Sequence, residues 1–396
     1  MAYINKSIQF TSDSYSATSW SWNFGDGSPV STLENPTHNY ATAGKFNVTL
    51  TINGGASVLT KNLYIHILPN RGTPYVVASD GGTFEINPND FGAQTLSGGV
   101  NKWERGVPAN ALVTVNSPVN VWKTDLDADV TEGDYACALQ TPSYNMTTAG
   151  TYTLRFRRSM EVTFCNAPLA VQLQYSTDKG ATWTRLGVDA DVNATNWYNR
   201  GPSTGCPIDA SIFADRYGWT LTGNNTLCTY NLTTGVPALV GQGEVTFRFV
   251  LSVKPGYGAS AYLADGFMVD DFEILGPVNG PFGATATIVT SGTLTPFSAC
   301  SGTASAQQSF TVSGTGLTTN LIITPPAGFE VSLTSGSGFA SSLSLTPSSG
   351  SVSTTTIFVR MTSTAVGHLP KYYLCFDRCY HSKCICKRYR KCTSHT

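Results

Sequence analysis

Residues 171–183, VQLQYSTDKGATW, carry the pattern that most constrains the fold of this chain. Val171, Leu173 and Tyr175 alternate with glutamines, which is the period of a β-strand with one buried face. The Asp-Lys-Gly that follows has turn chemistry, with glycine where a positive φ is needed, and the strand pattern resumes at Trp183. The segment is predicted to be a β-hairpin at the centre of a β-sandwich.

The rest of the chain repeats this pattern of short alternating segments between turn-forming residues. Charged residues make up only 12% of the 396 residues, and no long segment alternates at the helical period. The fold class is therefore predicted to be all-β. A chain of this length is expected to hold about two to four domains, and we predict three β-sandwich domains in tandem.

Two segments rich in proline and glycine mark the domain boundaries, at residues 70–74 and 276–283. The predicted domains are residues 1–69, 75–277 and 284–367, followed by a tail at residues 368–396. No apolar stretch approaches the roughly 20 residues that span a bilayer. The N-terminal residues lack the basic and apolar regions of a secretory signal, so an exported protein would begin before Met1.

The first domain contains three motifs ahead of its closing strands. They are SWSWNFGDG at residues 19–27, NPTHNY at 35–40 and AGKF at 43–46. Over residues 4–69 this order of motifs resembles the PKD domain, an immunoglobulin-like module of bacterial surface proteins and secreted enzymes. The resemblance implies a small β-sandwich, although the usual first strand of that fold is short or missing.

Within this domain, Trp22 and Phe24 are predicted to face the core. Asp26 is predicted to accept backbone hydrogen bonds in the turn that follows, with a calcium-binding role as the alternative. His38 belongs to a turn motif, and no nucleophile or second base accompanies it locally. A catalytic role for His38 is therefore not predicted.

The largest predicted domain, residues 75–277, consists of short strands between turn clusters, which indicates a sandwich or jelly roll. Its YSTDKGATW hairpin and its closing DGFMVDDFEI strand resemble the MAM-like and concanavalin-like jelly rolls attached to secreted bacterial proteases and adhesins. The resemblance implies a fold more firmly than a ligand.

An acidic loop of this domain is a candidate calcium site. Asp125, Asp127 and Asp129 place carboxylates at alternate positions, and calcium prefers such oxygen ligands. The resemblance adds Asp271 from the closing strand. The spacing is not that of an EF-hand, and a solvated acidic loop is the alternative.

Aromatic side chains of the same domain are candidates for glycan binding. Jelly rolls of the kind it resembles often bind glycans through exposed rings, which makes Trp197, Tyr198 and Trp219 the predicted ligand-binding residues. The alternative is that these residues belong to the core, the more usual place for tryptophan in a sandwich.

Cysteine is distributed unevenly along the chain. In an oxidising location, the four cysteines of the central domain are expected to form one or two disulfides, and they allow three pairings. They are Cys137, Cys165, Cys206 and Cys228. Five of the ten cysteines lie in the last 22 residues. From Lys371 onward the chain has seven basic residues and one acidic residue.

In the third domain, five alternating strands are separated by Ser/Gly/Pro turns, which indicates an immunoglobulin-like sandwich without its last strands. Each strand contains one residue of the set Phe310, Leu321, Phe329, Leu343 and Ile357. The runs SFTVSGTGL and PPAGFEVSL resemble a repeat of very large surface proteins from bacteria that use type IX secretion.

The tail matches no paired cysteine or histidine spacing of a known metal site. A zinc or disulfide knot and a basic arm for nucleic acid are two interpretations of it. We expect instead that the reading frame slips after Gly367, because a one-nucleotide shift turns residues 378–390 into GATTANVSVSGTV, the missing strand. No nucleic-acid partner is then predicted.

No motif of the common enzyme classes is present, among them HExxH, GxSxG, a Walker loop and the dinucleotide fingerprint. We predict a non-catalytic fragment of a secreted or cell-surface bacterial protein, acting in adhesion, spacing or glycan targeting. Its expected partners are a glycan or an extracellular protein surface, together with other domains of a longer polypeptide. The alternative is a set of accessory domains of an exported peptidase or glycosidase whose catalytic domain lies outside this chain.

Overall fold

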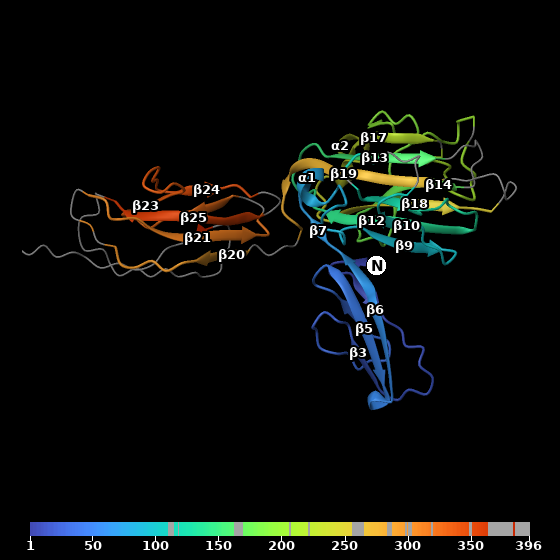
Figure 1. Ribbon diagram of the computed structural model, residues 1–396, viewed down its shortest axis with the longest axis horizontal. Coiled ribbons are helices and arrows are strands. Elements are labelled where there is room, and N and C mark those ends of the chain that lie inside the picture. Colours follow the sequence, from blue (N-terminus) through green and yellow to red (C-terminus); the bar gives the residue numbers. More distant parts are fainter. Residues whose placement is uncertain are drawn as a thin grey trace, which may run out of the picture. The chain divides into compact units, whose positions relative to one another are not determined.

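In the computed structural model of the chain, the regular secondary structure is almost entirely strand, which confirms the all-β prediction (Figure 1). The described residues form two compact units, Met1–Pro277 and Val278–Thr396, and the first two predicted domains lie together in the first unit. The structure describes residues 1–109, 115–117, 119–161, 169–205, 207–220, 222–255, 265–282, 287–297, 299, 303–317, 320–347, 351–362 and 383–384. Within these residues, no helix is long and apolar enough to cross a membrane.

The N-terminal part of the first unit is a small sandwich of a four-stranded sheet, in the order β1-β6-β5-β3, and a two-stranded sheet of β2 and β4. Trp22 and Phe24 are buried in its core, as predicted. The strands are β1 (Ala2–Tyr3), β2 (Ser7–Gln9), β3 (Trp20–Asn23), β4 (Thr37–Asn39), β5 (Gly44–Ile52) and β6 (Ser57–Leu68), with a 3-10 helix at Asn53–Gly55.

The turn after β3 has the structural role predicted for it. Gly25 has a φ of 79°, and a Cβ atom there would lie 2.2 Å from the carbonyl oxygen of Asn47, so only glycine fits. Asp26 accepts hydrogen bonds from the Ser28 amide and hydroxyl, at 3.1 and 2.6 Å, and contacts Nε2 of His38 at 2.7 Å. Burial raises the pKa of Asp26, but these hydrogen bonds outweigh burial and leave the pKa below its ordinary value.

The larger part of the first unit is a sandwich of two sheets (Figure 1). The first sheet contains β10 (Trp103–Gly106), β11 (Val121–Thr124), β19 (Gly266–Asn279), β13 (Thr153–Glu161), β17 (Gly223–Asn231) and β16 (Ala194–Thr195), in this order, and β8 (Thr73–Tyr75) pairs with β19. The second contains β15 (Thr184–Arg185), β14 (Leu169–Ser176), β18 (Val245–Val253), β12 (Tyr135–Tyr144) and β7 (Asn70–Arg71), and β9 (Gly92–Ser97) pairs with β12. Two short helices, α1 (Val77–Asp80) and α2 (Leu232–Gly235), and a 3-10 helix at Pro237–Leu239 were not predicted.

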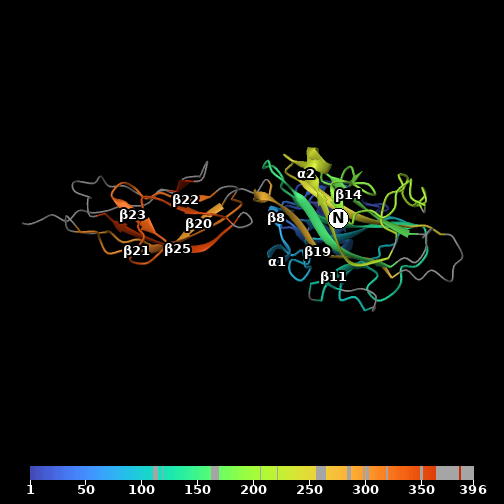
Figure 2. The same ribbon diagram turned by 90° about the horizontal axis from the view of Figure 1, so that it is seen from above.

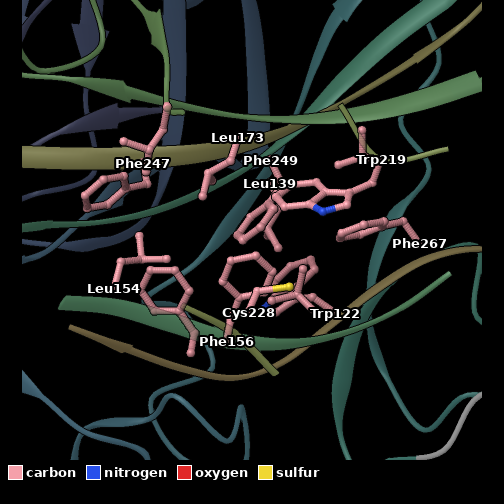
Figure 3. Close-up of a cluster of buried hydrophobic side chains, with 14 of the residues drawn as sticks. Trp122, Leu139, Leu154, Phe156, Leu173, Trp219, Cys228, Phe247, Phe249 and Phe267 are labelled. Carbon is pink, nitrogen blue, oxygen red and sulfur yellow. The ribbon is translucent and has the colours of Figure 1, made fainter. Parts of the chain in front are cut away.

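The core of this sandwich is rich in aromatic side chains that meet edge to face. Phe156 lies edge to face against Phe249 and against Trp219, with ring centroids 4.9 and 5.9 Å apart (Figure 3). Such rings contribute large buried areas and favourable edge contacts. The alternation that predicted strands also explains this core, because every second residue of each central strand faces inward.

The predicted hairpin is confirmed, but it lies at the edge of the second sheet and not at the centre of the sandwich. It consists of β14 and β15, and Lys179 and Gly180 adopt left-handed φ angles of 58° and 72° in the turn between them. Asp178 stabilises the turn by accepting hydrogen bonds from the backbone amides of Ala181 and Thr182, both at 2.9 Å. Hydrogen bonds from its own turn, first that of Ser176, lower the pKa of Asp178.

The segment predicted as a linker at residues 70–74 is part of the sheets. β7 pairs in parallel with β12, and β8 pairs with β19. Tyr3 of β1 also reaches the second sheet, where its hydroxyl lies 2.5 Å from Oγ1 of Thr246 and donates to the Thr141 carbonyl at 3.1 Å. Lys6 donates to the Lys179 carbonyl at 2.7 Å, so the small sandwich also contacts the hairpin turn.

The second unit is also all-β, and the five predicted strands are confirmed. Its first sheet, made of the strands β20, β21, β23 and β25 (Figure 2), has the order β20-β21-β25-β23, and its second has the order β24-β22-β26. The strands are β20 (Thr287–Ser291), β21 (Gln308–Thr315), β22 (Leu321–Ile323), β23 (Phe329–Ser332), β24 (Leu343–Leu345), β25 (Val352–Met361) and β26 (Lys383–Cys384). Apart from β26, the predicted tail lies outside the described residues, and so does the prediction of a slipped reading frame.

Candidate functional site

The three aromatic residues predicted to bind a ligand lie in the core. Trp197, Tyr198 and Trp219 are 5%, 4% and 0% exposed. Their polar atoms bond internally: Nε1 of Trp219 donates to the Trp197 carbonyl at 2.9 Å, and Nε1 of Trp197 donates to the Leu186 carbonyl at 3.0 Å. No face of these rings is open to a sugar, so the structure supports the core alternative for all three.

The structure does not bring together the four predicted calcium ligands, Asp125, Asp127, Asp129 and Asp271. Asp125 forms an ion pair with Lys102 at 2.8 Å, whereas Asp271 lies 3.6 Å from Arg157. Among the described residues, which include all four carboxylates, no group of three or more acidic, histidine or cysteine side chains is arranged to hold a metal ion. These residues therefore do not fit a calcium ion as one ligand set.

A buried lysine lies at the base of the acidic loop. Lys123 is 0% exposed, its Nζ lies 3.1 Å from Oδ1 of Asp265, and it donates to the carbonyl oxygen of Asp125. The Asp265 carboxylate is also buried, and its oxygens have no other partner in the described part of the chain. The Lys123 ammonium thus supplies the positive charge that a buried carboxylate requires.

Millimolar calcium and a chelator are expected to give the same melting temperature. A calcium ion at this loop would have to compete with Lys102 and Lys123, which already neutralise the nearby oxygens. Differential scanning calorimetry in the two buffers measures the effect. A higher melting temperature in calcium that is lost in Asp127→Asn would instead establish a calcium site in the loop.

A different set of side chains forms a line across the second sheet. Gln140 of β12 lies opposite Arg248 of β18, Arg248 lies opposite Gln174 of β14, and Gln174 lies opposite Arg185 of β15. Directly opposed residues on neighbouring strands place their side chains about 5 Å apart on one face. We call these four residues the polar row.

The polar row lies on the outer face of the sheet. The neighbours of its members along the strands, Leu139, Leu173 and Phe249, are fully buried and belong to the core (Figure 3). Because side chains alternate between the faces of a strand, the polar row points away from that core. Arg185, Gln174 and Arg248 are partly exposed.

Two aromatic rings hold the arginines of the polar row. The guanidinium carbon of Arg248 lies 4.2 Å from the ring centroid of Trp183, and that of Arg185 lies 4.0 Å from the ring of Tyr217. Both rings are partly exposed, and they come from the hairpin and from a loop. Stacking of this kind orients a guanidinium and leaves its edge available for hydrogen bonds.

Amide side chains connect the polar row to its surroundings. Nε of Arg248 donates to Oε1 of Gln174 at 2.8 Å, and Nε2 of Gln174 donates to Oε1 of Gln172 at 2.9 Å. Nε2 of Gln172 in turn donates to Oδ1 of Asp215 at 3.0 Å, and Asp215 also forms an ion pair with Arg185. The network fixes the directions of these polar groups before any ligand arrives.

The other end of the polar row reaches the small sandwich. Oε1 of Gln140 lies 3.3 Å from the Tyr3 hydroxyl oxygen, and Nε2 of Gln140 donates to Oε1 of Gln94 at 2.5 Å. Burial raises the pKa of Tyr3, which therefore remains a neutral phenol. The candidate site thus extends from β15 to the boundary with the N-terminal sandwich.

Sequence reasoning missed the polar row, although its signal is present. Gln172 and Gln174 alternate with core residues in β14, and Thr246 and Arg248 do the same in β18. Polar residues on the second face of a central strand indicate a solvated or binding face. Which strands are neighbours, and hence which polar residues align, depends on the order of the sheet.

Two of the four cysteines in this sandwich can be placed. Cys137 and Cys228 are buried free thiols. Burial raises the pKa of Cys228 to about 11, which makes it an unreactive core residue. Cys165 and Cys206 lie outside the described residues, and their pairing stays a prediction.

The family model of the PKD domain matches residues 2–67 of the chain. This match confirms the PKD resemblance of the first predicted domain, whereas the MAM-like jelly roll, the immunoglobulin-like repeat and the type IX secretion setting stay predictions. No curated protein matches the chain.

Three solved structures illustrate how distant the structural likeness is. One contains carbohydrate-binding modules from the β-sandwich superfamily, with 15% identity, a TM-score of 0.24 and coverage of 69% of this chain and 93% of that chain. The glycoside hydrolase domain of Endo-D from Streptococcus pneumoniae R6 has 13% identity and a TM-score of 0.25, and the match covers 68% of this chain and 31% of that chain. The adhesin domain of Epf from Streptococcus pyogenes has 13% identity and a TM-score of 0.23, and the match covers 75% of this chain and 85% of that chain. TM-scores this low assign neither a fold nor a ligand, and the comparisons identify residues 2–67 alone, as a PKD domain.

Proposed function

We propose that this chain is a non-catalytic binding module of an extracellular or cell-surface protein, and that it binds glycans on the outer face of its second sheet. The observation that carries the proposal is the polar row, in which Gln140, Arg248, Gln174 and Arg185 align across four strands. The PKD match of residues 2–67 supports a role outside the cell in adhesion, spacing or targeting.

The chemistry of the polar row suits a polyhydroxylated ligand. Amide and guanidinium groups offer several donors and acceptors in fixed directions, which matches the adjacent hydroxyl groups of a sugar ring. Trp183 and Tyr217 add partly exposed ring surface beside these groups. Combining apolar ring faces with a few convergent polar groups is the usual composition of a ligand site.

The test is binding of the chain to a panel of insoluble and soluble polysaccharides. Trp183→Ala and Tyr217→Ala are each expected to weaken binding roughly tenfold, because each removes apolar surface and releases an oriented arginine. Affinity electrophoresis measures the change for soluble polymers, and a pull-down measures it for insoluble ones.

Tyr15→Ala is the matched control, because Tyr15 is 95% exposed and belongs to the small sandwich. Binding in Tyr15→Ala is expected to equal that of the unaltered chain. Circular dichroism shows whether each variant is folded. If no polysaccharide binds, or if both Trp183→Ala and Tyr217→Ala bind like the unaltered chain, the proposal is wrong.

A further inference from the structure

The two arginines of the polar row differ in their charge balance. Arg185 forms an ion pair with Asp215. Arg248 forms no ion pair with any described residue, and within that part of the chain it donates a hydrogen bond from Nε to the neutral Gln174. Arg185 is therefore neutralised within the protein, whereas Arg248, inside the polar row, carries a positive charge that no described residue balances.

Acidic side chains near the hairpin turn are committed to other partners. Asp178 accepts hydrogen bonds from the backbone and hydroxyl groups of its own turn, and Glu244 forms an ion pair with Lys179 at 3.3 Å. Tyr3, on the side of the small sandwich, is a neutral phenol that hydrogen-bonds to Thr246 and Thr141. None of these groups supplies the missing negative charge.

The Arg248 side chain is held in place for a ligand. The Trp183 ring covers one face of the guanidinium at 4.2 Å, and Gln174 binds the Nε edge. No described residue binds the two terminal nitrogens, which are left for a partner that approaches the partly exposed outer face. Their fork matches the two oxygens of a carboxylate or a sulfate ester, and charge-assisted pairs of this kind are stronger than neutral hydrogen bonds.

Partial burial makes this charge costly without a partner. Burial lowers the pKa of Arg248 to about 10, which shows that the surroundings disfavour the isolated cation. An anionic group on the ligand would recover part of that cost, whereas a neutral sugar would not.

We propose that Arg248 binds an anionic group of the ligand, so that the glycan recognised by this face is an acidic one carrying carboxylate or sulfate groups. The inference rests on the proposed glycan-binding function and adds the class of ligand. The carboxylate of a uronic acid and a sulfate ester share the required chemistry.

The experiment compares ligands that differ in charge on the same backbone. Polygalacturonate is compared with its methyl ester, and dextran sulfate with dextran, by affinity electrophoresis of the whole chain. The charged member of at least one pair is expected to bind roughly tenfold more tightly than the neutral member. Arg248→Gln is expected to lose this preference, and Arg248→Lys is expected to keep part of it because the charge remains without the fork.

Arg360→Gln is the matched control, because Arg360 also stacks on an aromatic ring, Phe339, but is neutralised by Glu330 in the other unit. The Arg360→Gln variant is expected to show the same preference for charged polymers as the unaltered chain. The basic tail is present in every variant, so only the part of the preference that is lost in Arg248→Gln is assigned to Arg248.

The outcomes separate this inference from the proposed function. A preference for one charged pair identifies whether carboxylate or sulfate is the source, and its loss in Arg248→Gln supports the inference. Equal binding of charged and neutral polymers, or an unchanged preference in a folded Arg248→Gln variant, overturns the inference and leaves the glycan-binding proposal intact. Failure of every polymer to bind overturns both.

Discussion

Replacing Lys123 with alanine is expected to lower the free energy of unfolding by about 3–5 kcal/mol, because the change leaves the Asp265 carboxylate buried without a counter-charge. The Asp125 carbonyl oxygen would also lose its hydrogen bond from Nζ. Urea denaturation followed by tryptophan fluorescence measures the effect, since five of the seven tryptophans belong to the larger sandwich.

A second variant distinguishes loss of the ion pair from loss of packing. The double variant Lys123→Met and Asp265→Asn removes both charges and keeps similar volumes, so it is expected to regain much of the lost stability. Lys254→Ala is the surface control, because its partner Asp134 is 65% exposed, and a change below about 0.5 kcal/mol is expected. Equal stability of Lys123→Ala and Lys254→Ala would show that the buried pair has no special role.

Trp219→Ala is expected to cost about 3–5 kcal/mol of unfolding free energy, because it empties a fully buried position. The ring lies against Tyr198 and Trp197, with centroids 4.6 and 5.4 Å away, and its loss would remove both contacts. Thermal unfolding by circular dichroism measures the change. Trp219→Phe keeps most of the apolar volume and is expected to cost less.

This prediction also decides between core and surface roles for Trp219. A ligand-binding tryptophan on the surface would give a variant of normal stability that fails to bind glycans. The expected result is the reverse: a large loss of stability in Trp219→Ala and glycan binding by Trp219→Phe close to that of the unaltered chain.

The hairpin of β14 and β15 could be predicted because its determinants are local. Alternation places Val171 and Leu173 in the core, and a residue with positive φ at Gly180 closes the turn. The same reasoning gave the five strands of the second unit and the turn at Asp26. In each case the sequence within about ten residues determines the structure.

The candidate site depends on contacts between distant segments, and this is why it was missed. Trp219 is buried because its backbone pairs with Val171, through hydrogen bonds of 2.9 and 3.0 Å between residues far apart in the sequence. Gln140, Gln174 and Arg248 align because β18 lies between β12 and β14, an order that does not follow the chain. Residue type and spacing contain neither fact.

The acidic loop shows a further limit of sequence patterns. Its carboxylates have the spacing of a cation site, but the cation that the structure pairs with Asp125 is the ammonium of Lys102, which lies just before strand β10. A side chain that contributes its own positive charge leaves no trace in the spacing of the acidic residues around it.

The joint between the two sandwiches of the first unit has a mechanical consequence. Residues 70–74 run through β7 and β8, and Tyr3 and Lys6 cross to the larger sandwich, so rotation about this joint would break sheet pairing and buried hydrogen bonds together. These contacts are therefore expected to hold the two sandwiches in a fixed relative orientation. If the proposed glycan-binding function holds, neighbouring copies on one surface would present their outer faces in the same direction, which would favour simultaneous attachment to a single long polysaccharide.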